Sequence, residues 1–332
     1  YNVISEGGDT DSQYQTREDI QGALTSMYNN IKSSLQQSMV EYLLTITDAM
    51  TDNSYTPRNA STAPLERHTQ DAANGIISSS WNYYLGYVND ANQIITYIDG
   101  IEDATLTETE RNQWKAEALI WRAWSWFQMT LLWGDVPLIT EAPPAITADN
   151  IEEVYPLYYP PRIEQQKVFE KIAEDLDWAK DYAPDLNTTD KFKMSKAVAY
   201  GLLARVYAEK PIRDYDMVIT SCEAEEAMNM QLVDDYSDLW SRNDDKTDMK
   251  ARNSSESIFE VPYTKSSGNW RWMMYWRNGI GDNPDASFDW QKWNTPSRNL
   301  IAHYESEGDN IRMNQTIVWD QPGWSTYYPS DN

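Results

Sequence analysis

The segment WKAEALIWRAWSWFQMTLLWGDVPL, residues 114–138, decides the fold because it joins a long helical pattern to an abrupt end. Its apolar residues recur at three- and four-residue steps and extend around most of the surface of a helix. Gly134 ends the pattern, since glycine tolerates the backbone that closes a helix. We therefore expect a largely buried central helix over 105–133. Its apolar positions are Trp114, Ala118, Ile120, Trp121, Ala123, Trp124, Phe127, Leu131 and Leu132.

Further helices are expected on both sides of this central helix. Apolar spacing predicts them over 16–35, 81–100, 163–183, 194–209, 213–228 and 296–306, with one strand over 257–262. In the helix at 194–209, small residues recur so that a neighbouring backbone can approach closely, as in tetratricopeptide-type helix pairs. These small residues are Ala197, Gly201, Ala204 and Ala208. The sequence thus predicts a mainly α protein with a tetratricopeptide-like scaffold and few short strands.

Two long stretches interrupt the helical pattern. Residues 48–80 are rich in Asp, Asn, Thr and Ser, and residues 264–328 hold seven tryptophans and four tyrosines among small and polar residues. Loops of this length in a compact domain are often functional. We expect one domain spanning 1–332, with its helical scaffold mainly at 17–47 and 81–230 and an irregular ligand-binding half formed by the loops at 48–80 and 264–328.

The charge of the chain favours neutral partners. Lys and Arg total 27 against 52 Asp and Glu, and the net charge of −25 opposes nucleic acids, anionic lipids and acidic polysaccharides. The single Cys222 excludes an internal disulfide, and we expect it to be a small buried side chain. No apolar run approaches the roughly 18 to 20 residues of a membrane helix. Residues 1–15 also lack the pattern of a signal peptide.

The aromatic residues point to carbohydrate binding. The chain has 15 Trp and 22 Tyr but only 5 Phe, so its aromatics combine flat apolar faces with hydrogen-bonding edges. A sugar ring has the complementary surface, an apolar face and a hydroxyl-rich edge. We predict ligand contacts in the second loop region from Trp270, Trp272, Tyr275, Trp276, Arg277, Asn278, Trp290 and Trp293. The alternative is that these rings only pack the loops onto the helices.

Enzymatic signatures are absent from the sequence. With two histidines, His68 and His303, it contains no His-Glu-x-x-His motif, no Gly-x-Ser-x-Gly motif and no phosphate-binding loop. We therefore predict a protein without catalytic residues, metal or cofactor. A helical-toroid glycoside hydrolase remains the alternative, because it needs only two carboxylates. The acidic group at Asp244, Asp245 and Asp248 does not match an EF-hand, so a solvated loop is favoured over a calcium site.

Several motifs, in the same order along the chain, resemble those of the SusD/RagB family of nutrient-binding outer-membrane lipoproteins. The most specific is the segment from Ala116-Glu117-Ala118 through Arg122 and Phe127 to Gly134-Asp135-Val136-Pro137-Leu138. The others are Trp81-x-x-Tyr84, Asn92-x-Ile94-Ile95, Val168-Phe169 to Ala179, Met194-Ser195-Lys196-Ala197, Ala204-Arg205-Val206-Tyr207, Tyr236-Ser237-Asp238-Leu239-Trp240, Glu256 to Glu260, and Asn299 to Arg312. The resemblance spans residues 17–312.

This resemblance implies a function at the cell surface. Such a protein captures oligosaccharides, neutral ones here, and delivers them to a TonB-dependent SusC-like transporter from the extracellular face of the outer membrane. Family members also bind ligand through loops that precede the Trp-x-x-Tyr helix, which adds the candidates Asp52, Arg58, Asn59 and Arg67. A peptide-binding member of the same family is a further alternative. The lipid-anchored cysteine of the family is absent, and family members usually continue further, so a truncated chain is expected.

Overall fold

The computed structural model describes residues 14–32, 48–55, 62–241, 243–245, 248–262 and 295–317, and this part is mainly α-helical, as predicted. Its α-helices are α1 (Arg17–Lys32), α3 (Ala63–Glu66), α4 (Gly75–Tyr97), α5 (Glu108–Trp133), α6 (Ile151–Val154), α7 (Gln165–Tyr182), α8 (Lys196–Ala208), α9 (Tyr215–Glu226), α10 (Arg298–Glu307) and α11 (Asn310–Thr316). The 3-10 helices are η2 (Ile98–Gly100), η3 (Tyr155–Tyr158), η4 (Lys210–Ile212) and η5 (Tyr236–Leu239).

Two antiparallel strand pairs complete the described elements. β1 (Ser54–Tyr55) pairs with β4 (Thr295–Pro296), and β2 (Val136–Pro137) pairs with β3 (Arg162–Ile163). By compactness the chain divides into unit 1, residues 1–39, 79–231 and 255–262, and unit 2, residues 40–78, 232–254 and 263–332. The expected organisation as a single domain stays a prediction.

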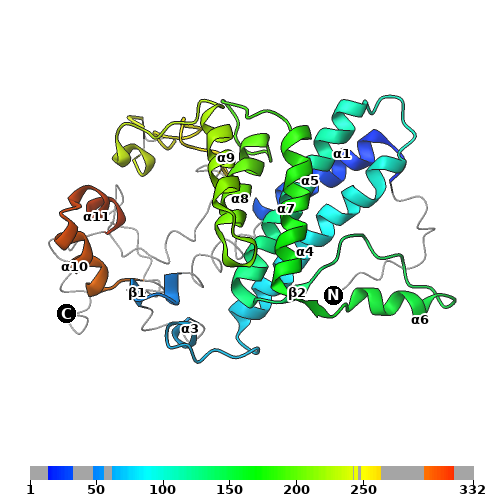
Figure 1. Ribbon diagram of the computed structural model, residues 1–332, viewed down its shortest axis with the longest axis horizontal. Helices are drawn as coiled ribbons and strands as arrows, with labels where there is room; N and C mark the ends of the chain where they lie inside the picture. Colours follow the sequence, from blue (N-terminus) through cyan, green and yellow to red (C-terminus); the bar gives the residue numbers. More distant parts are fainter. Residues whose placement is uncertain are drawn as a thin grey trace. The chain divides into compact units, whose positions relative to one another are not determined.

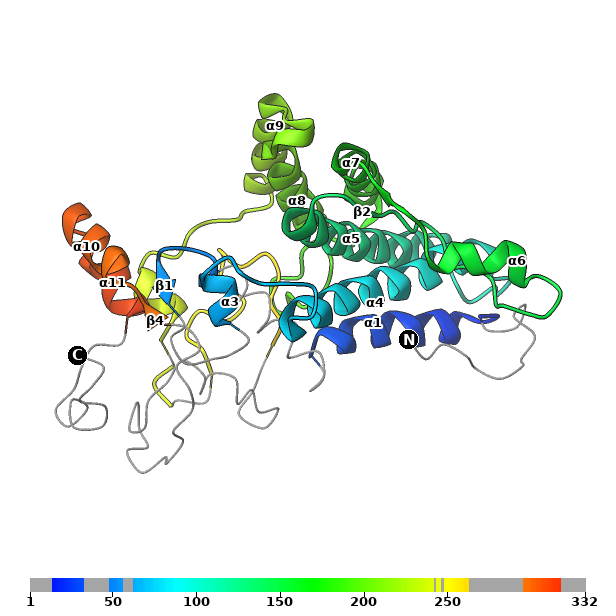
Figure 2. The same cartoon turned by 90° about the horizontal axis from the view of Figure 1, so that it is seen from below.

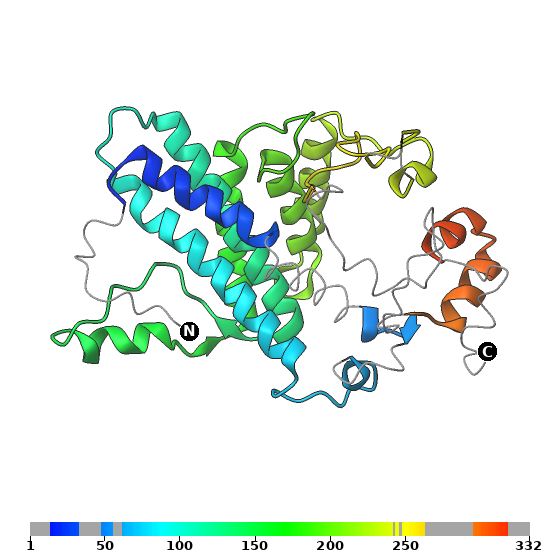
Figure 3. The same ribbon diagram turned by 180° about the vertical axis from the view of Figure 1, so that it is seen from behind.

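Unit 1 is a stack of helices centred on α5. α7 packs on one side of α5, α8 packs on α7 and α9 packs on α8 (Figure 1), while α4 and α1 lie on the other side of α5 (Figures 2 and 3). Sequential helices that pack as neighbours are typical of helical repeats. Gly201 shows how closely α8 and α9 approach, because a Cβ placed there would lie 2.9 Å from Glu225 Oε1.

α5 is buried along most of its length, as its sequence predicts. Trp121, Trp126 and Phe127 are fully buried, whereas Leu131 near its end is exposed, contrary to the predicted apolar stripe. A capping box fixes the beginning of the helix: Thr107 Oγ1 accepts from the Glu110 N–H, and the Glu110 carboxylate accepts from the Thr107 N–H. Gly134 ends the helix at φ +69°, where other residues are strained.

A buried ion pair joins α5 to α7. Arg122 Nε and Nη2 donate to the two carboxylate oxygens of Asp175 at 2.8 and 2.9 Å, and both side chains are almost fully buried. Arg122 Nη1 also donates to Asn92 Oδ1 on α4 and to the Thr140 carbonyl, and Asn92 Nδ2 donates to the Ile139 carbonyl. The bidentate geometry and these extra bonds satisfy charges that would otherwise be costly to bury. Arg122, which belongs to the Glu-Ala-x-x-x-Arg motif on α5, therefore links this helix to α7, to α4 and to the backbone at Thr140.

A second buried carboxyl joins α5 to α1. Tyr28 Oη donates to Glu117 Oε2 at 2.5 Å and accepts from the Met194 N–H at 2.8 Å. Glu117 is only 2% exposed, and burial raises its pKa to about 7, although the hydrogen bond from Tyr28 and the charge of Lys193 act in the opposite direction. Glu117 therefore gains its proton as the pH falls through about 7, well above the range of an ordinary glutamate.

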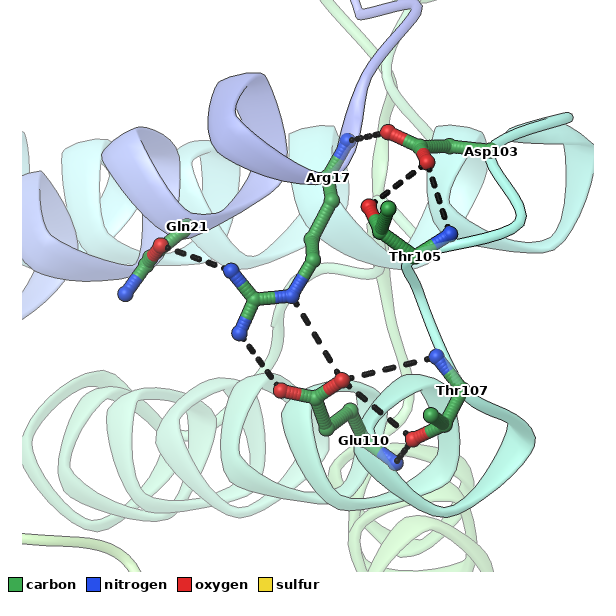
Figure 4. Close-up of polar contacts among 6 residues, drawn as sticks. All are labelled: Arg17, Gln21, Asp103, Thr105, Thr107 and Glu110. Atoms are coloured by element: carbon green, nitrogen blue, oxygen red, sulfur yellow. Dashed lines mark hydrogen bonds and ion pairs between the residues drawn. The ribbon is translucent and has the colours of Figure 1, made fainter.

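The first residue of α1 docks on the first turn of α5. Figure 4 shows Arg17 reaching Glu110, with Nη2 2.6 Å from Oε1, while its backbone N–H donates to Asp103. Backbone and side-chain hydrogen bonds from Arg17 and Thr105 lower the pKa of Asp103 to about 2. The guanidinium carbon of Arg17 also lies 5.1 Å from the ring centroid of Trp114. The ion pair and the cation–π contact of Arg17 thus fix the beginning of α1 against the beginning of α5.

Three sequence predictions are wrong in detail. α4 begins at Gly75 rather than residue 81, because the Asn74 side chain caps the N–H groups of Ile76 and Ile77. Residues 257–262 are not a strand; within the described residues, the Glu260 N–H donates to the Lys191 carbonyl without the repeated backbone bonds of a strand pair. Cys222 is exposed on α9 rather than buried. None of the helices in the described ranges is long and apolar enough to cross a membrane.

Replacing Arg122 with Ala is expected to lower the free energy of unfolding by about 3 kcal/mol, because the buried Asp175 would lose its bidentate partner and keep only the ion pair with Lys171 at 3.1 Å. Urea denaturation followed by circular dichroism measures this loss. The control is Lys196→Ala, which removes a pair with the exposed Asp185 and should cost less than about 1 kcal/mol. Equal losses in the two variants would contradict the central role of the buried pair.

The buried carboxyl of Glu117 predicts a stability that depends on pH. Its pKa is about 7 in the folded protein against 4.5 for an ordinary glutamate, so the folded state binds the proton more tightly. The free energy of unfolding should then fall between about pH 4.5 and 7, by at most about 1.4 kcal/mol per pH unit.

Urea titrations at several pH values test this dependence with two variants. Glu117→Gln removes the titrating group and should flatten the decline over this range. Glu223→Gln, on the exposed face of α9, should keep it. The same slope in wild type and Glu117→Gln would show that another group causes the dependence.

Candidate functional site

Most of the predicted ligand-binding residues lie outside the described residues. These are Arg58, Asn59, Trp270, Trp272, Tyr275, Trp276, Arg277, Asn278, Trp290 and Trp293. The other two, Asp52 and Arg67, are exposed and belong to unit 2. Arg67 directly follows the short α3, and its N–H donates to the Ala63 carbonyl. No hydrogen bond or ion pair in the described part of the chain joins Asp52 to Arg67, so their common role stays a prediction.

A strand pair connects the two predicted loop regions within unit 2. β1 pairs with β4 in the register Ser54↔Pro296 and Tyr55↔Thr295. Ser297, directly after β4, extends the contact, because its Oγ donates to the Asp52 carbonyl at 2.6 Å and its N–H donates to the Asn53 carbonyl at 2.8 Å. Residues 52–55 therefore contact the residues that follow the predicted aromatic stretch directly in the sequence.

The chain after β4 forms two short helices. Ser297 caps α10 by accepting from the Leu300 N–H at 3.2 Å, and Gly308 ends this helix in the left-handed conformation at φ +68°. Asp309 then caps α11 by accepting from the Arg312 N–H and pairs with the Arg312 guanidinium. α10 packs on α11, and α11 packs on η5. This succession of contacts links β1 and β4 to η5 inside unit 2.

η5 presents an exposed aromatic side chain that the sequence analysis did not select as a ligand contact. Trp240, directly after η5, is 54% exposed, the largest exposure of any tryptophan among the described residues. The Tyr236 ring lies beside it with a centroid distance of 6.2 Å and a tilt of 58°. Trp240 thus offers a flat, partly wet face of the kind that stacks on a sugar ring.

Polar groups of neighbouring residues hold the backbone on both sides of this tryptophan. Asp235 caps η5 by accepting from the Ser237 N–H at 2.9 Å, and Ser241 Oγ donates to the Ser237 carbonyl at 2.7 Å. Lys250 closes the loop, because its N–H donates to the Ser241 carbonyl and its ammonium pairs with Asp238. The Asp238 carboxylate belongs to a residue two positions before Trp240, and Lys250 is bonded to Ser241, the residue after Trp240. An exposed aromatic face on a loop that also carries charged hydrogen-bonding groups can hold a polyhydroxylated ligand.

One carboxylate of the neighbouring acidic group, that of Asp248, pairs with a protein cation. Asp248 Oδ1 lies 2.5 Å from Arg252 Nε, and this hydrogen bond lowers the pKa of Asp248. Across the described residues, no three His, Cys, Asp or Glu side chains are grouped so that they could hold a metal ion. The prediction that Asp244, Asp245 and Asp248 form a solvated acidic loop stays a prediction.

The tryptophans of the helical segments belong to the scaffold. Trp121 and Trp126 are fully buried, and Trp114 is nearly so. Trp124 packs against Tyr84 and Trp121, with ring centroids 5.9 and 5.6 Å apart. Trp81 meets the edge of Trp133 at 5.2 Å, and the Arg162 guanidinium lies 5.0 Å from the Trp81 ring centroid. These rings stabilise helix packing, as expected from their periodic spacing.

Residues 8–208 match the family of SusD-like proteins described as "Starch-binding associating with outer membrane". The match covers more than half of the 332 residues. The chain belongs to the SusD-like family. The motif residues Glu117, Arg122 and Asp175, which carry the resemblance in the sequence, are thus the residues that form the buried polar contacts of the scaffold. The family is one of proteins associated with the outer membrane.

Two curated relatives are similar along nearly all of this SusD-like chain. SusD-like protein P2 of Formosa agariphila is 24% identical over 310 residues, which are 91% of this chain and 57% of the relative. A SusD-like protein of Bacteroides ovatus is 23% identical over 320 residues, which are 94% of this chain and 55% of the relative. The chain therefore spans a little over half the length of these relatives.

Solved structures share the fold. A SusD superfamily protein from Bacteroides thetaiotaomicron matches with a TM-score of 0.68 at 19% identity, covering 94% of this chain and 67% of that one. A crystal structure with xylogluco-oligosaccharide matches with a TM-score of 0.66 at 20% identity, covering 89% and 56%. A laminarin-binding SusD-like protein gives 0.55 at 18%, covering 71% and 51%. At these identities the likeness establishes the tetratricopeptide-like SusD fold.

Replacing Ser297 with Ala is expected to loosen the junction of β1 with α10 in this SusD-like chain. The variant loses the hydroxyl that accepts from the Leu300 N–H and donates to the Asp52 carbonyl. Losing this helix cap should lower the free energy of unfolding by about 0.5 to 2 kcal/mol. Hydrogen–deuterium exchange should become faster at residues 52–55 and in the first turn of α10. Ser306→Ala, on the same helix, is the control, because its hydroxyl donates to the His303 carbonyl. Exchange that is unchanged in Ser297→Ala would contradict this role.

Proposed function

We propose that the chain is a non-enzymatic, cell-surface protein that binds neutral oligosaccharides and delivers them to a SusC-like TonB-dependent transporter. Membership of the SusD-like family carries this proposal, since its description names starch binding and association with the outer membrane. One protein of the same fold is described with xylogluco-oligosaccharide, and another is described as laminarin-binding. The sugar class, the transporter and a position on the extracellular face through a lipid anchor are all parts of the proposal.

The charge of the chain supports a neutral ligand. The net charge of −25 repels uronic-acid and sulfated polymers, so neutral glycans are the better candidates. The exposed face of Trp240 offers stacking without a requirement for ligand charge. Both properties suit a sugar whose affinity comes from C–H contacts with aromatic rings and from hydroxyl hydrogen bonds.

We place the main site in unit 2. The proposed contacts are the predicted residues of the 270–293 stretch, the loop candidates Asp52, Arg58, Asn59 and Arg67, and Trp240. The observation that supports a common site is the β1–β4 pairing, since it ties residues 52–55 to residues 295–297. Residues 295–297 follow the 270–293 stretch closely in the sequence, and they contact residues 52–55 of the other candidate region. Trp240 belongs to the same unit and follows η5, which packs on α11.

Binding and hydrolysis can be separated by two assays on the same samples. Native affinity electrophoresis is run with xyloglucan, laminarin and starch as neutral glycans, with pectin as an acidic one. A reducing-end assay on the same polysaccharides detects hydrolysis. Retardation by a neutral glycan without new reducing ends supports the proposal. Release of reducing ends would favour the glycoside hydrolase, and no retardation by any glycan would favour a peptide ligand.

Three single substitutions locate the binding site on the protein, and the ligand in these experiments is the glycan that causes retardation. Trp272→Ala, Trp276→Ala and Trp240→Ala should each lower affinity by about 1 to 3 kcal/mol, or roughly 5- to 150-fold, if stacking on sugars resembles stacking on bases. Isothermal titration calorimetry measures the change. Tyr215→Ala is the control, because this exposed ring lies on α9 in unit 1. Unchanged affinity in Trp272→Ala and Trp276→Ala would remove the predicted stretch from the site, and unchanged affinity in Trp240→Ala would remove Trp240.

A further inference from the structure

A short stretch between α7 and α8 holds a segment that returns to unit 1 much later in the sequence. We name residues 191–194 the clasp and residues 255–260 the return segment. Lys191 Nζ donates to the Ser257 carbonyl at 2.5 Å, and the Lys191 carbonyl accepts from the Glu260 N–H at 3.1 Å. Two hydrogen bonds of one residue therefore fasten the return segment to the scaffold.

The return segment closes the base of a long loop. The chain leaves unit 1 after Gln231, forms residues 232–254 and comes back to unit 1 at Ser255. The Gln231 N–H donates to the Ser255 carbonyl at 3.1 Å, so the residues on either side of this loop are bonded to each other. Trp240 belongs to this loop. The clasp thus holds the base from which the loop with the exposed tryptophan begins.

The clasp is bonded to α1 as well. The Met194 N–H donates to Tyr28 Oη at 2.8 Å, and the same hydroxyl donates to Glu117 Oε2 at 2.5 Å. The Phe192 ring contacts the rings of Tyr28 and Phe259, with centroids 5.4 and 5.9 Å away. A continuous series of contacts therefore leads from the Glu117 carboxyl through Tyr28 and the clasp to the return segment.

Glu117 is the member of this series whose charge changes near neutral pH. In the described part of the chain, the titratable groups that face its buried carboxyl are Tyr28 from α1 and Lys193 from the clasp. Burial raises the pKa of Glu117 to about 7, against the smaller effects of the Tyr28 hydrogen bond and the Lys193 charge. Tyr28 keeps its proton in this range, because burial raises the pKa of its hydroxyl well above the ordinary value. An ionised Glu117 is therefore a buried charge that contact with water would stabilise.

Ionisation of Glu117 favours an opening of the contacts that cover it. An opening that exposes the carboxyl lets its pKa return toward 4.5, so the opening becomes more favourable as the pH rises between about 4.5 and 7. The contacts that such an opening breaks include the bonds of the Tyr28 hydroxyl to Glu117 and to Met194. Proton linkage bounds the effect, because the equilibrium constant for opening rises by at most about twentyfold from pH 5.5 to 7.5.

We propose that the clasp is a pH-sensitive fastening for the return segment, which holds the segment firmly when Glu117 is protonated and loosens when Glu117 ionises. Tyr28 transmits the change, because its hydroxyl bonds to both Glu117 and Met194. The device belongs to unit 1 and does not depend on which ligand the protein binds.

Hydrogen–deuterium exchange of the full chain at pH 5.5 and 7.5, read by NMR and corrected for the pH dependence of intrinsic exchange, tests the clasp. Protection of the Met194 and Glu260 amides should fall by about threefold to twentyfold at the higher pH. Protection of the Ala183 N–H, which is bonded to the Ala179 carbonyl at the end of α7, should stay constant. An equal fall at Ala183 would overturn the proposal. So would exchange at Met194 that is as slow as in the middle of α7, because the clasp would then open only when the helices unfold.

Three variants assign the effect to Glu117. Glu117→Gln keeps an acceptor for Tyr28 and should abolish the pH difference at Met194 and Glu260. Glu225→Gln is the matched control and should keep the difference. Burial also raises the pKa of Glu225, and its carboxylate lies beside Gly201 together with Ile258 of the return segment.

Tyr28→Phe keeps the ring, removes the hydroxyl and should lower the protection of Met194 at both pH values. This variant decides the question if Glu117→Gln does not fold. A pH difference that persists in Glu117→Gln or disappears in Glu225→Gln would overturn the role of Glu117. Unchanged protection of Met194 in Tyr28→Phe would overturn the transmission through Tyr28.

Discussion

The pairing of Arg122 with Asp175 is the interaction on which the rest of unit 1 depends. A guanidinium buried among helices has a large desolvation cost, which only a partner of matched geometry can offset. Arg122 has such a partner on α7, and its remaining N–H group bonds to α4 and to the backbone after β2. One side chain therefore sets the relative positions of α4, α5 and α7. Apolar packing alone would allow these helices to shift along one another, because it has no direction.

The aromatic residues divide according to their surroundings. Those on α4 and α5 fill spaces between helices, and their exposure is low because periodic spacing directs them inward. Trp240 follows a single turn of 3-10 helix in a segment without such spacing, and it stays exposed. The same residue type thus stabilises the scaffold in one sequence context and offers a ligand-sized face in the other. Abundance of tryptophan alone does not distinguish these roles, whereas the regularity of its context does.

The sequence predicts the long helices well because each of them buries a periodic apolar face. Arg298–Glu307, Tyr215–Glu226 and the end of α5 at Gly134 lie close to their expected positions. The sequence fails to predict the helix start where local hydrogen bonds decide it, as at Asn74, whose side chain caps α4 six residues before its expected beginning. The expected strand at 257–262 fails because strands need a partner, and sequence alone does not name one. The two-residue pairs β1–β4 and β2–β3 are too short to leave a periodic signal.

For the site, sequence analysis names positions but not contacts. It selects Asp52 and Arg67, which are exposed and whose ligand contacts stay predictions, and it passes over Trp240, which it treats only as part of a motif. The four-residue spacing of Tyr236 and Trp240, in the irregular segment after α9, is the signal that marks this pair. The β1–β4 contact could not be predicted, because the hydroxyl of Ser297 reaches a carbonyl 245 positions earlier.

That separation along the chain has a consequence during synthesis. A ribosome adds about 5 to 20 residues per second, so residues 52–55 wait roughly 10 to 50 seconds before Ser297 exists. The helices of unit 1 join residues much nearer in the sequence and can form in that interval. β1, by contrast, is synthesised before its pairing strand. Its unpaired backbone groups can form hydrogen bonds with other chains until β4 leaves the ribosome.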